Sequence, residues 1–183
     1  MSARGRGAVI RPSENYPTPA WCVHRLLEAL PLPCGAWLEP CAGEGAIVKA
    51  CRLPVRWTTW DLRPVKATKT GDALQLAQEA REGAFRVGLT NPPFSLAGPL
   101  LGALRPICEH VVMLLRLNWL ASAARHPVLS LDMPDVFVLP NRPCFVNGKS
   151  DATEYAWMHW GPARRESGRV QLLALTPRAE RTA

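Results

Sequence analysis

A short proline-rich turn constrains this chain more than any other feature. The run Phe85-Arg86-Val87-Gly88-Leu89 has the pattern of a buried strand, and Thr90-Asn91-Pro92-Pro93-Phe94 follows it directly. Proline has no amide hydrogen to donate to a sheet and holds φ at about −65°, so the strand must end here and the turn must be rigid. Ligands of open α/β sheets bind at the carboxyl ends of the strands. We therefore expect residues 90–94 to lie at the functional edge of a sheet.

The same turn has the groups needed to hold a planar amine. The Asn91 carboxamide oxygen and the Pro92 carbonyl can accept both hydrogens of an –NH2 group, and Phe94 can stack on the ring that carries the amine. Binding both hydrogens favours a pyramidal nitrogen whose lone pair is free to attack. An ordinary proline turn would have the same five residues, so the rest of the chain has to decide between the two interpretations.

Length, composition and charge predict a globular domain with a polyanionic partner. With 183 residues and 48% hydrophobic side chains, the chain can bury a core and is expected to form one domain. We expect a cytoplasmic protein, because the sequence has neither an apolar run of about 18 residues nor an apolar signal core. The net charge of +7 favours a nucleic acid, although it could serve solubility alone. The six cysteines include no C-x-x-C pair, and we predict no metal site.

A second pattern predicts a loop that binds a small ligand. An apolar strand at residues 36–38 ends in Glu39, and the small-residue loop Pro40-Cys41-Ala42-Gly43-Glu44-Gly45 leads into a helix. Gly43 and Gly45 can adopt positive φ and let a ligand approach the backbone, and Glu39 suits a cationic group such as an α-ammonium. The dinucleotide fingerprint would need a third glycine. A plain strand–helix loop is the alternative.

Two further acidic residues follow predicted strands. Asp61 ends the strand at residues 55–61, about 20 residues beyond the glycine loop, which is the spacing at which an acid binds ribose hydroxyls. Asp72 follows Gly71 after the next short strand. Either carboxylate could instead cap a helix or end a strand. Upstream, Thr18 is a plausible helix N-cap before Pro19.

The order of these motifs resembles that of small phage-type DNA N6-adenine methyltransferases. In sequence order it comprises Tyr16-Pro17-Thr18-Pro19 before a helix, the loop from Glu39 to Gly45, the strand-end Asp61, Gly71-Asp72 and Asn91-Pro92-Pro93-Phe94. The resemblance covers residues 13–160. It implies a class I S-adenosylmethionine-dependent methyltransferase fold, which is α/β and Rossmann-like, with a mostly parallel seven-stranded sheet and helices on both faces.

The resemblance also implies a role for each motif. S-adenosyl-L-methionine would be the cofactor, with its methionine part flanked by the Tyr16 side chain and the Thr18 backbone, its ribose at Asp61 and its adenine amine near Asp72. The residues implied in cofactor binding are Tyr16, Thr18, Glu39, Pro40, Cys41, Ala42, Gly43, Gly45, Asp61, Asp72 and Asn91. The residues implied in catalysis are Asn91, Pro92, Pro93 and Phe94.

The chain leaves no room for the separate target-recognition domain of larger DNA enzymes. We expect a flexible basic arm at residues 1–12, a single methyltransferase domain at residues 13–176 and a tail at residues 177–183. Recognition would then depend on the loops at residues 118–132 and 141–153. The candidate contacts to phosphates or base edges are Arg116, Arg125, Arg142 and Lys149, each of which is by itself better explained as a solvated surface charge.

The expected reaction is direct, in-line methyl transfer to the N6 amine of a flipped-out adenine in DNA, which we expect to be duplex. A phage-encoded enzyme of this kind would work in the cytoplasm of its bacterial host. Adenine in RNA and the amide of a protein glutamine allow the same chemistry, although glutamine enzymes usually have tyrosine where this chain has Phe94. A degenerate fold that only binds nucleic acid is a further alternative, which the intact glycine loop disfavours.

Overall fold

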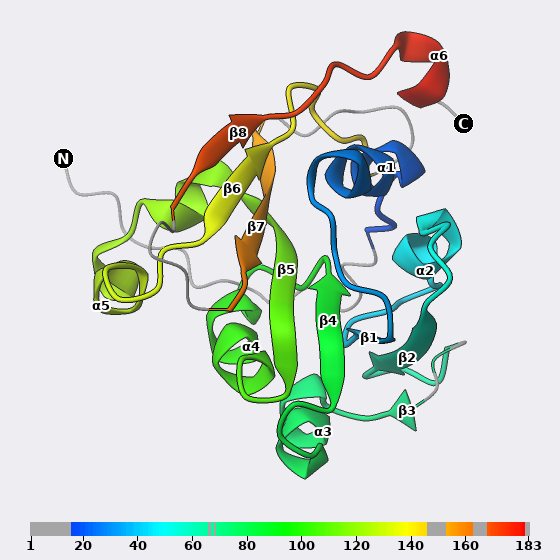
Figure 1. Ribbon diagram of the computed structural model, residues 1–183, viewed down its shortest axis with the longest axis vertical. Coiled ribbons are helices and arrows are strands. Elements are labelled where there is room, and N and C mark those ends of the chain that lie inside the picture. The colour runs from blue at the N-terminus through cyan, green and yellow to red at the C-terminus, as the bar shows by residue number, and fades with distance from the viewer. Residues whose placement is uncertain (1–15, 66, 68, 146–152, 163–167, 182–183) are drawn as a thin grey trace, which may run out of the picture.

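The computed structural model describes residues 16–65, 67, 69–145, 153–162 and 168–181 (Figure 1). These residues form one eight-stranded sheet with the strand order β3-β2-β1-β4-β5-β7-β6-β8. Among these strands only β7 runs antiparallel to its neighbours, and every other pair is parallel. The expected α/β fold with a mostly parallel sheet is therefore confirmed. The predicted basic arm at residues 1–12 and Lys149 lie outside the described residues.

The first half of the chain alternates strands with helices. Its strands are β1 (Ala36–Glu39), β2 (Arg56–Asp61), β3 (Lys69–Thr70), β4 (Phe85–Thr90) and β5 (Cys108–Arg116). Its helices are α1 (Ala20–Ala29), α2 (Ala46–Ala50), α3 (Ala73–Glu79) and α4 (Ala97–Leu104). The chain passes outward from β1 to β3 and then returns to the other side of β1 as β4. Ligands of open α/β sheets bind at such a reversal, which here lies between β1 and β4.

The second half of the chain completes the other side of the sheet. A connection of short helices comes first, comprising η1 (Leu117–Leu120), η2 (Ala123–Arg125) and α5 (His126–Leu129). It is followed by β6 (Asp135–Val138), β7 (Tyr155–Trp160), β8 (Val170–Leu172) and α6 (Arg178–Arg181). The strands β1 to β7 account for the seven that were expected. β8 adds an eighth strand at the edge, where all three of its residues are exposed.

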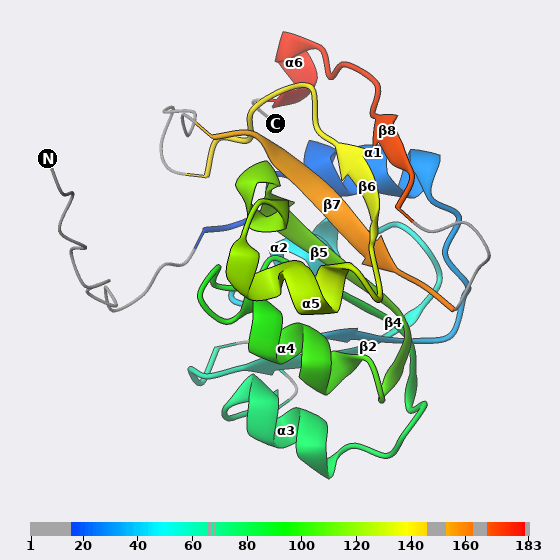
Figure 2. The same cartoon turned by 90° about the vertical axis from the view of Figure 1, so that its left-hand side faces the viewer.

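Helices cover both faces of the sheet, as expected (Figure 1, Figure 2). α1 and α2 pack on one face, where the buried cluster includes Trp37 and Trp157. α3 and α4 pack on the other face, where the cluster includes Trp60 and Met113. β5 contributes to both clusters, because residues 111–115 alternate between the two faces and are all fully buried. Within the part of the chain that the structure describes, no helix is long and apolar enough to cross a membrane.

The start of α1 differs from the expected cap. The helix begins at Ala20 after Pro19, and no side chain caps it. The Thr18 side chain is buried instead, and its hydroxyl accepts a hydrogen bond from Asn91. The prediction that Thr18 caps the helix is therefore wrong, because this hydroxyl bonds to a distant segment and not to its own helix.

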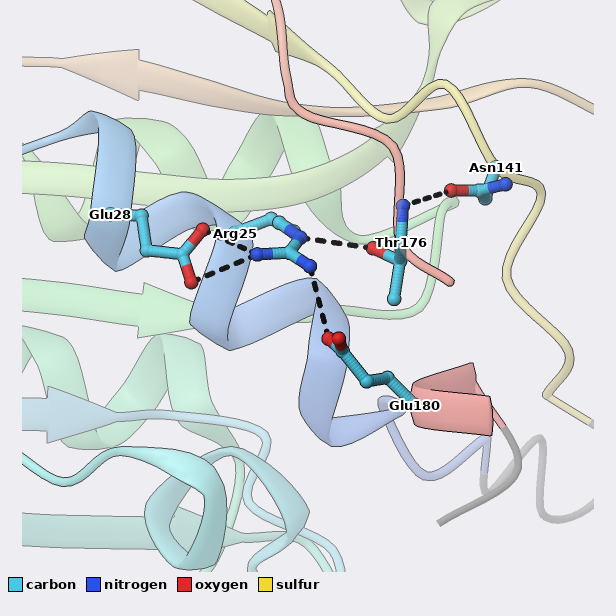
Figure 3. A network of polar contacts seen from close by, with 5 residues as sticks. All are labelled: Arg25, Glu28, Asn141, Thr176 and Glu180. Atoms are coloured by element: carbon cyan, nitrogen blue, oxygen red, sulfur yellow. Dashed lines mark hydrogen bonds and ion pairs between the residues drawn. The ribbon is translucent and has the colours of Figure 1, made fainter. Parts of the chain in front are cut away.

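The segment after β8 returns across α1 and joins it to the loop that follows β6 (Figure 3). The Thr176 N–H donates to Asn141 Oδ1 over 2.7 Å, and Arg25 Nε donates to the Thr176 hydroxyl over 3.1 Å. Arg25 also pairs with Glu180 over 3.0 Å and with Glu28 over 2.7 Å. We call Arg25, Asn141, Thr176 and Glu180 the C-terminal brace. Part of the segment expected as a tail, residues 178–181, thus forms α6 and contacts α1 through Glu180.

Candidate functional site

The carboxyl ends of four strands contribute predicted site residues to one edge of the sheet. Glu39 and Asp61 are the last residues of β1 and β2. Asp72 follows β3 closely, and Asn91 follows β4 directly. Burial raises the pKa of the Cys41 thiol to about 12, and the carboxylates of Asp61, Glu39 and Asp72 contribute to this rise. The structure therefore brings the three predicted acidic residues together around a thiol of the glycine loop.

The glycine loop is folded against the end of β2. The Ala42 N–H donates to the Trp60 carbonyl over 2.9 Å, and the Gly43 N–H donates to Asp61 Oδ2 over 2.7 Å. Gly43 and Gly45 have φ angles of 50° and 74°, in the left-handed region that favours glycine. A Cβ at Gly45 would meet no atom within 4 Å. The backbone conformation and not crowding therefore requires glycine there, and open space lies beside the loop.

Glu39 is a buried carboxylate with one unsatisfied oxygen. The residue is 2% exposed, and the Val48 N–H donates to the carboxylate. Among the described residues, no group donates to Glu39 Oε2. Burial raises the pKa of Glu39 well above its usual value, and the nearby Asp61 carboxylate adds to the rise. Buried acceptors without a partner are rare in folded proteins, so this oxygen fits a cationic donor such as the ammonium group of an amino-acid ligand.

The other two acidic residues already have hydrogen-bond partners. Asp61 accepts from the Gly43 N–H through Oδ2 and from the Arg63 N–H, over 2.9 Å, through Oδ1. Asp72 accepts from the Leu74 N–H over 2.8 Å and thereby caps α3. A carboxylate oxygen can accept more than one hydrogen bond. The ribose at Asp61 and the adenine amine at Asp72 therefore stay predictions, and the structure shows an additional structural role for each residue.

Contacts from the segment at residues 16–18 fix the carboxamide of Asn91. Nδ2 donates to Thr18 Oγ1 over 3.1 Å and to the Tyr16 carbonyl over 3.4 Å. A carbonyl oxygen can only accept, so the NH2 group must face Tyr16 and Oδ1 is turned away from both partners. Pro92 is buried beside Asn91. The helix-start motif and the Asn-Pro-Pro-Phe turn are therefore in direct contact, although 73 residues separate Thr18 from Asn91.

Phe94 belongs to a cluster of aromatic side chains. Its ring centroid lies 6.0 Å from that of Tyr155, which lies 5.0 Å from that of Phe145. The guanidinium carbon of Arg116 lies 4.4 Å from the centroid of the Phe94 ring, and Arg116 Nε donates to the Tyr155 hydroxyl over 3.3 Å. A cation therefore covers one face of Phe94. A base that stacks on this ring would have to use the other face or displace Arg116.

The sequence motifs predict no role for Tyr155 or Phe145. Tyr155 is the first residue of β7 and pairs in the sheet with Arg116, the last residue of β5. Phe145 also contacts Tyr16, with 6.2 Å between the ring centroids. The available signal was an aromatic residue at the start of a strand that follows a loop rich in turn residues. This signal does not reveal that β7 runs antiparallel to β5 and so brings Tyr155 to the same edge.

The described basic candidates are held by neighbours within the chain. Arg125 Nε donates to the Trp119 carbonyl over 2.6 Å, and its guanidinium carbon lies 5.0 Å from the centroid of the Trp119 ring. Arg142 pairs with Glu154 over 2.5 Å, and this hydrogen bond lowers the pKa of Glu154. Arg116 packs against the Asn-Pro-Pro-Phe turn. Contacts of these residues with nucleic acid stay predictions, and Arg116 is the candidate shown beside the turn.

Comparisons with solved structures show the fold. A proposed class I S-adenosylmethionine-dependent methyltransferase from Listeria monocytogenes has a TM-score of 0.55 and 10% identity, over 89% of this chain and 67% of that one. The 23S rRNA methyltransferase ErmE has a TM-score of 0.54 and 14% identity, over 86% and 71%. A modification subunit of a proposed type I restriction enzyme from Vibrio vulnificus has a TM-score of 0.52 and 15% identity, over 79% and 44%. No protein-family model and no curated protein sequence matches the chain.

At identities this low, the comparisons establish architecture and not activity. The chain has the class I methyltransferase fold, as the order of its motifs implied. The similar structures include proteins described as acting on different substrates, so the fold by itself does not select among them. The chemistry of this chain has to be argued from its own site.

Proposed function

We propose that this protein is an S-adenosylmethionine-dependent methyltransferase that methylates the N6 amine of adenine in DNA. The observation that carries the proposal is the orientation of the Asn91 carboxamide at the carboxyl edge of the sheet. Its Oδ1 is turned away from Tyr16 and Thr18, which hold Nδ2. Together with the Pro92 carbonyl, this oxygen supplies the two acceptors that a planar amine needs.

Groups suited to S-adenosylmethionine lie at the same edge. The unsatisfied Glu39 Oε2 fits the α-ammonium group, and the open space beside Gly45 leaves room next to the loop backbone. Asp61 would accept from the ribose hydroxyls while it keeps its hydrogen bond from Gly43. Asp72 would lie near the adenine amine of the cofactor. When bound, the cofactor supplies a sulfonium methyl group that an amine can take by direct attack.

The chain's own residues would position the target amine. An adenine within a duplex would have to leave the stack, because its N6 atom cannot be reached there. Asn91 Oδ1 and the Pro92 carbonyl would accept the two amine hydrogens and so direct the nitrogen lone pair toward the methyl group. Phe94 would stack on the base from the side that Arg116 leaves open. Most of the rate enhancement would then come from positioning.

Sequence and structure favour adenine over other amine substrates. The sequence motif Asn-Pro-Pro-Phe and the net charge of +7 favour a nucleobase over a protein glutamine. Adenine in RNA is the second candidate, since the 23S rRNA methyltransferase named above has the same fold. A module that only binds nucleic acid would need neither an oriented Asn91 nor an unsatisfied Glu39.

The test is transfer of a labelled methyl group from S-adenosylmethionine to DNA, RNA and protein in parallel, followed by digestion to nucleosides and amino acids. We expect label in N6-methyladenine from DNA. Label in RNA or protein would keep the amine chemistry and overturn the substrate. No label in any of the three, with cofactor binding measured, would contradict the proposed activity.

Asn91→Ala tests the catalytic role of Asn91. The variant should bind S-adenosylmethionine as the wild type does and lose turnover, because it lacks the acceptor for the amine. If it lost cofactor affinity and kept turnover, the role assigned to Asn91 would be wrong.

A further inference from the structure

The Thr18 hydroxyl is the short contact that holds the Asn91 carboxamide. Thr18 is 5% exposed, so water competes little with Asn91 for its hydroxyl. Its distance of 3.1 Å to Asn91 Nδ2 is shorter than the 3.4 Å from Nδ2 to the Tyr16 carbonyl. No side chain caps α1, so this helix does not account for the hydroxyl. The structure shows this hydroxyl accepting a hydrogen bond from Asn91.

The Tyr16 carbonyl makes the carboxamide orientation unambiguous, because it can only accept, whereas the Thr18 hydroxyl can accept or donate. A rotation of the Asn91 amide by 180° would place Oδ1 against the Tyr16 carbonyl, where two acceptors would face each other. The rotated amide would also leave its NH2 group on the side where the target amine needs an acceptor. The Tyr16 carbonyl belongs to the backbone and is kept by any residue, whereas the Thr18 hydroxyl depends on the side chain.

We infer that Thr18 is a positioning residue, whose hydroxyl holds the Asn91 carboxamide so that Oδ1 is available to the target amine. This inference rests on the proposed function and goes beyond the cofactor role that its motif implies. A hydrogen bond accepted from Nδ2 also polarises the carboxamide and strengthens Oδ1 as an acceptor. The side chain of Thr18 therefore acts on turnover, whereas its backbone is what the resemblance assigns to the cofactor.

The test compares Thr18→Val with Thr18→Ser in the methyl-transfer assay. Valine keeps the shape and removes the hydroxyl, and we expect kcat to fall about tenfold, the upper end of what one hydrogen bond contributes. Serine keeps the hydroxyl, and we expect kcat within about threefold of the wild type. The Kd for S-adenosylmethionine should change by less than about twofold in both variants, since the backbone is retained.

Thr176→Val is the matched control, because it makes the same change at another buried threonine, which lies in the C-terminal brace. Its hydroxyl also accepts one side-chain hydrogen bond, from Arg25 Nε over 3.1 Å. We expect this variant to keep the wild-type kcat.

A second readout needs no substrate. The side-chain NH2 resonances of Asn91, assigned by their loss in Asn91→Ala, should exchange slowly with water in the wild type and in Thr18→Ser. They should exchange faster in Thr18→Val. Slow exchange in Thr18→Val, wild-type kcat in that variant, or equal loss in Thr18→Ser would overturn the inference. If no methyl acceptor is found, the exchange measurement still decides whether Thr18 holds Asn91, so the two failures are distinguishable.

Discussion

Replacing Glu39 by glutamine should stabilise the ligand-free protein and weaken cofactor binding at the same time. Glutamine copies the shape of the protonated carboxyl group. Burial raises the pKa of Glu39 in the folded state, so the unfolded chain loses this proton at a lower pH. The stability linked to the proton is fully present below the unfolded pKa of about 4.3 and is lost as the pH rises through the raised folded value. The variant cannot ionise and keeps that stability.

The magnitudes of the stability gain and of the loss in cofactor affinity can both be estimated. Each unit by which the folded pKa of Glu39 exceeds its unfolded value lowers the stability of the ionised wild type by about 1.4 kcal/mol, so the variant should have the higher free energy of unfolding at pH 8 and an equal one at pH 4. For a chain of this length, each kcal/mol corresponds to about 2–4 °C in Tm. A hydrogen bond between charged groups contributes about 1.5–3 kcal/mol. The Kd for S-adenosylmethionine should therefore rise about 10- to 150-fold.

Thermal unfolding across this pH range and calorimetric titration with S-adenosylmethionine measure both effects. Glu79→Gln makes the same change at the exposed end of α3, and it should leave Tm and Kd unchanged. A Glu39→Gln variant that is no more stable than the wild type at pH 8 would refute the stability argument. An unchanged Kd would show that Glu39 does not bind the ammonium group.

Three further substitutions test other contacts. Asp61→Ala removes the acceptor for the Gly43 N–H, and it should cost about 2 kcal/mol in thermal unfolding and weaken cofactor binding. Arg116→Met should leave cofactor affinity unchanged and raise the KM for nucleic acid. If Arg116 contacts a phosphate, the slope of log KM against log salt concentration should also fall by about one. An unchanged slope would contradict that contact. Arg25→Met disrupts the C-terminal brace and should lower Tm by about 2–4 °C in a thermal melt.

Local sequence patterns were sufficient to predict where the site residues lie on the strands. The end of a strand depends on a few adjacent residues, as in the prolines after Asn91 and the glycines after Glu39. Parallel strands joined by crossover helices place all their carboxyl ends at one edge. Both the edge and the residues that reach it therefore followed from the chain alone, and the structure confirms the fold on which they depend.

Contacts between distant segments could not be predicted in this way. The hydroxyl of Thr18 has the same local surroundings whether it caps α1 or accepts from Asn91, and the choice depends on how the helix docks. Arg116 covers Phe94 because β7 pairs antiparallel with β5 and brings Tyr155 beside it. No short window of sequence contains these relationships, because each joins elements whose packing is set by the whole sheet.

The order of strands has a consequence for the protein during its synthesis. β6 pairs with β7 and β8, and both of these strands leave the ribosome after it. β6 therefore has no sheet neighbour until β7 has been synthesised, which takes seconds at about 5–20 residues per second. The loop that carries Asn141 lacks its hydrogen bond from the Thr176 N–H until a further 35 residues have been added. The edge of β5 is thus exposed in the growing chain until β7 has been synthesised.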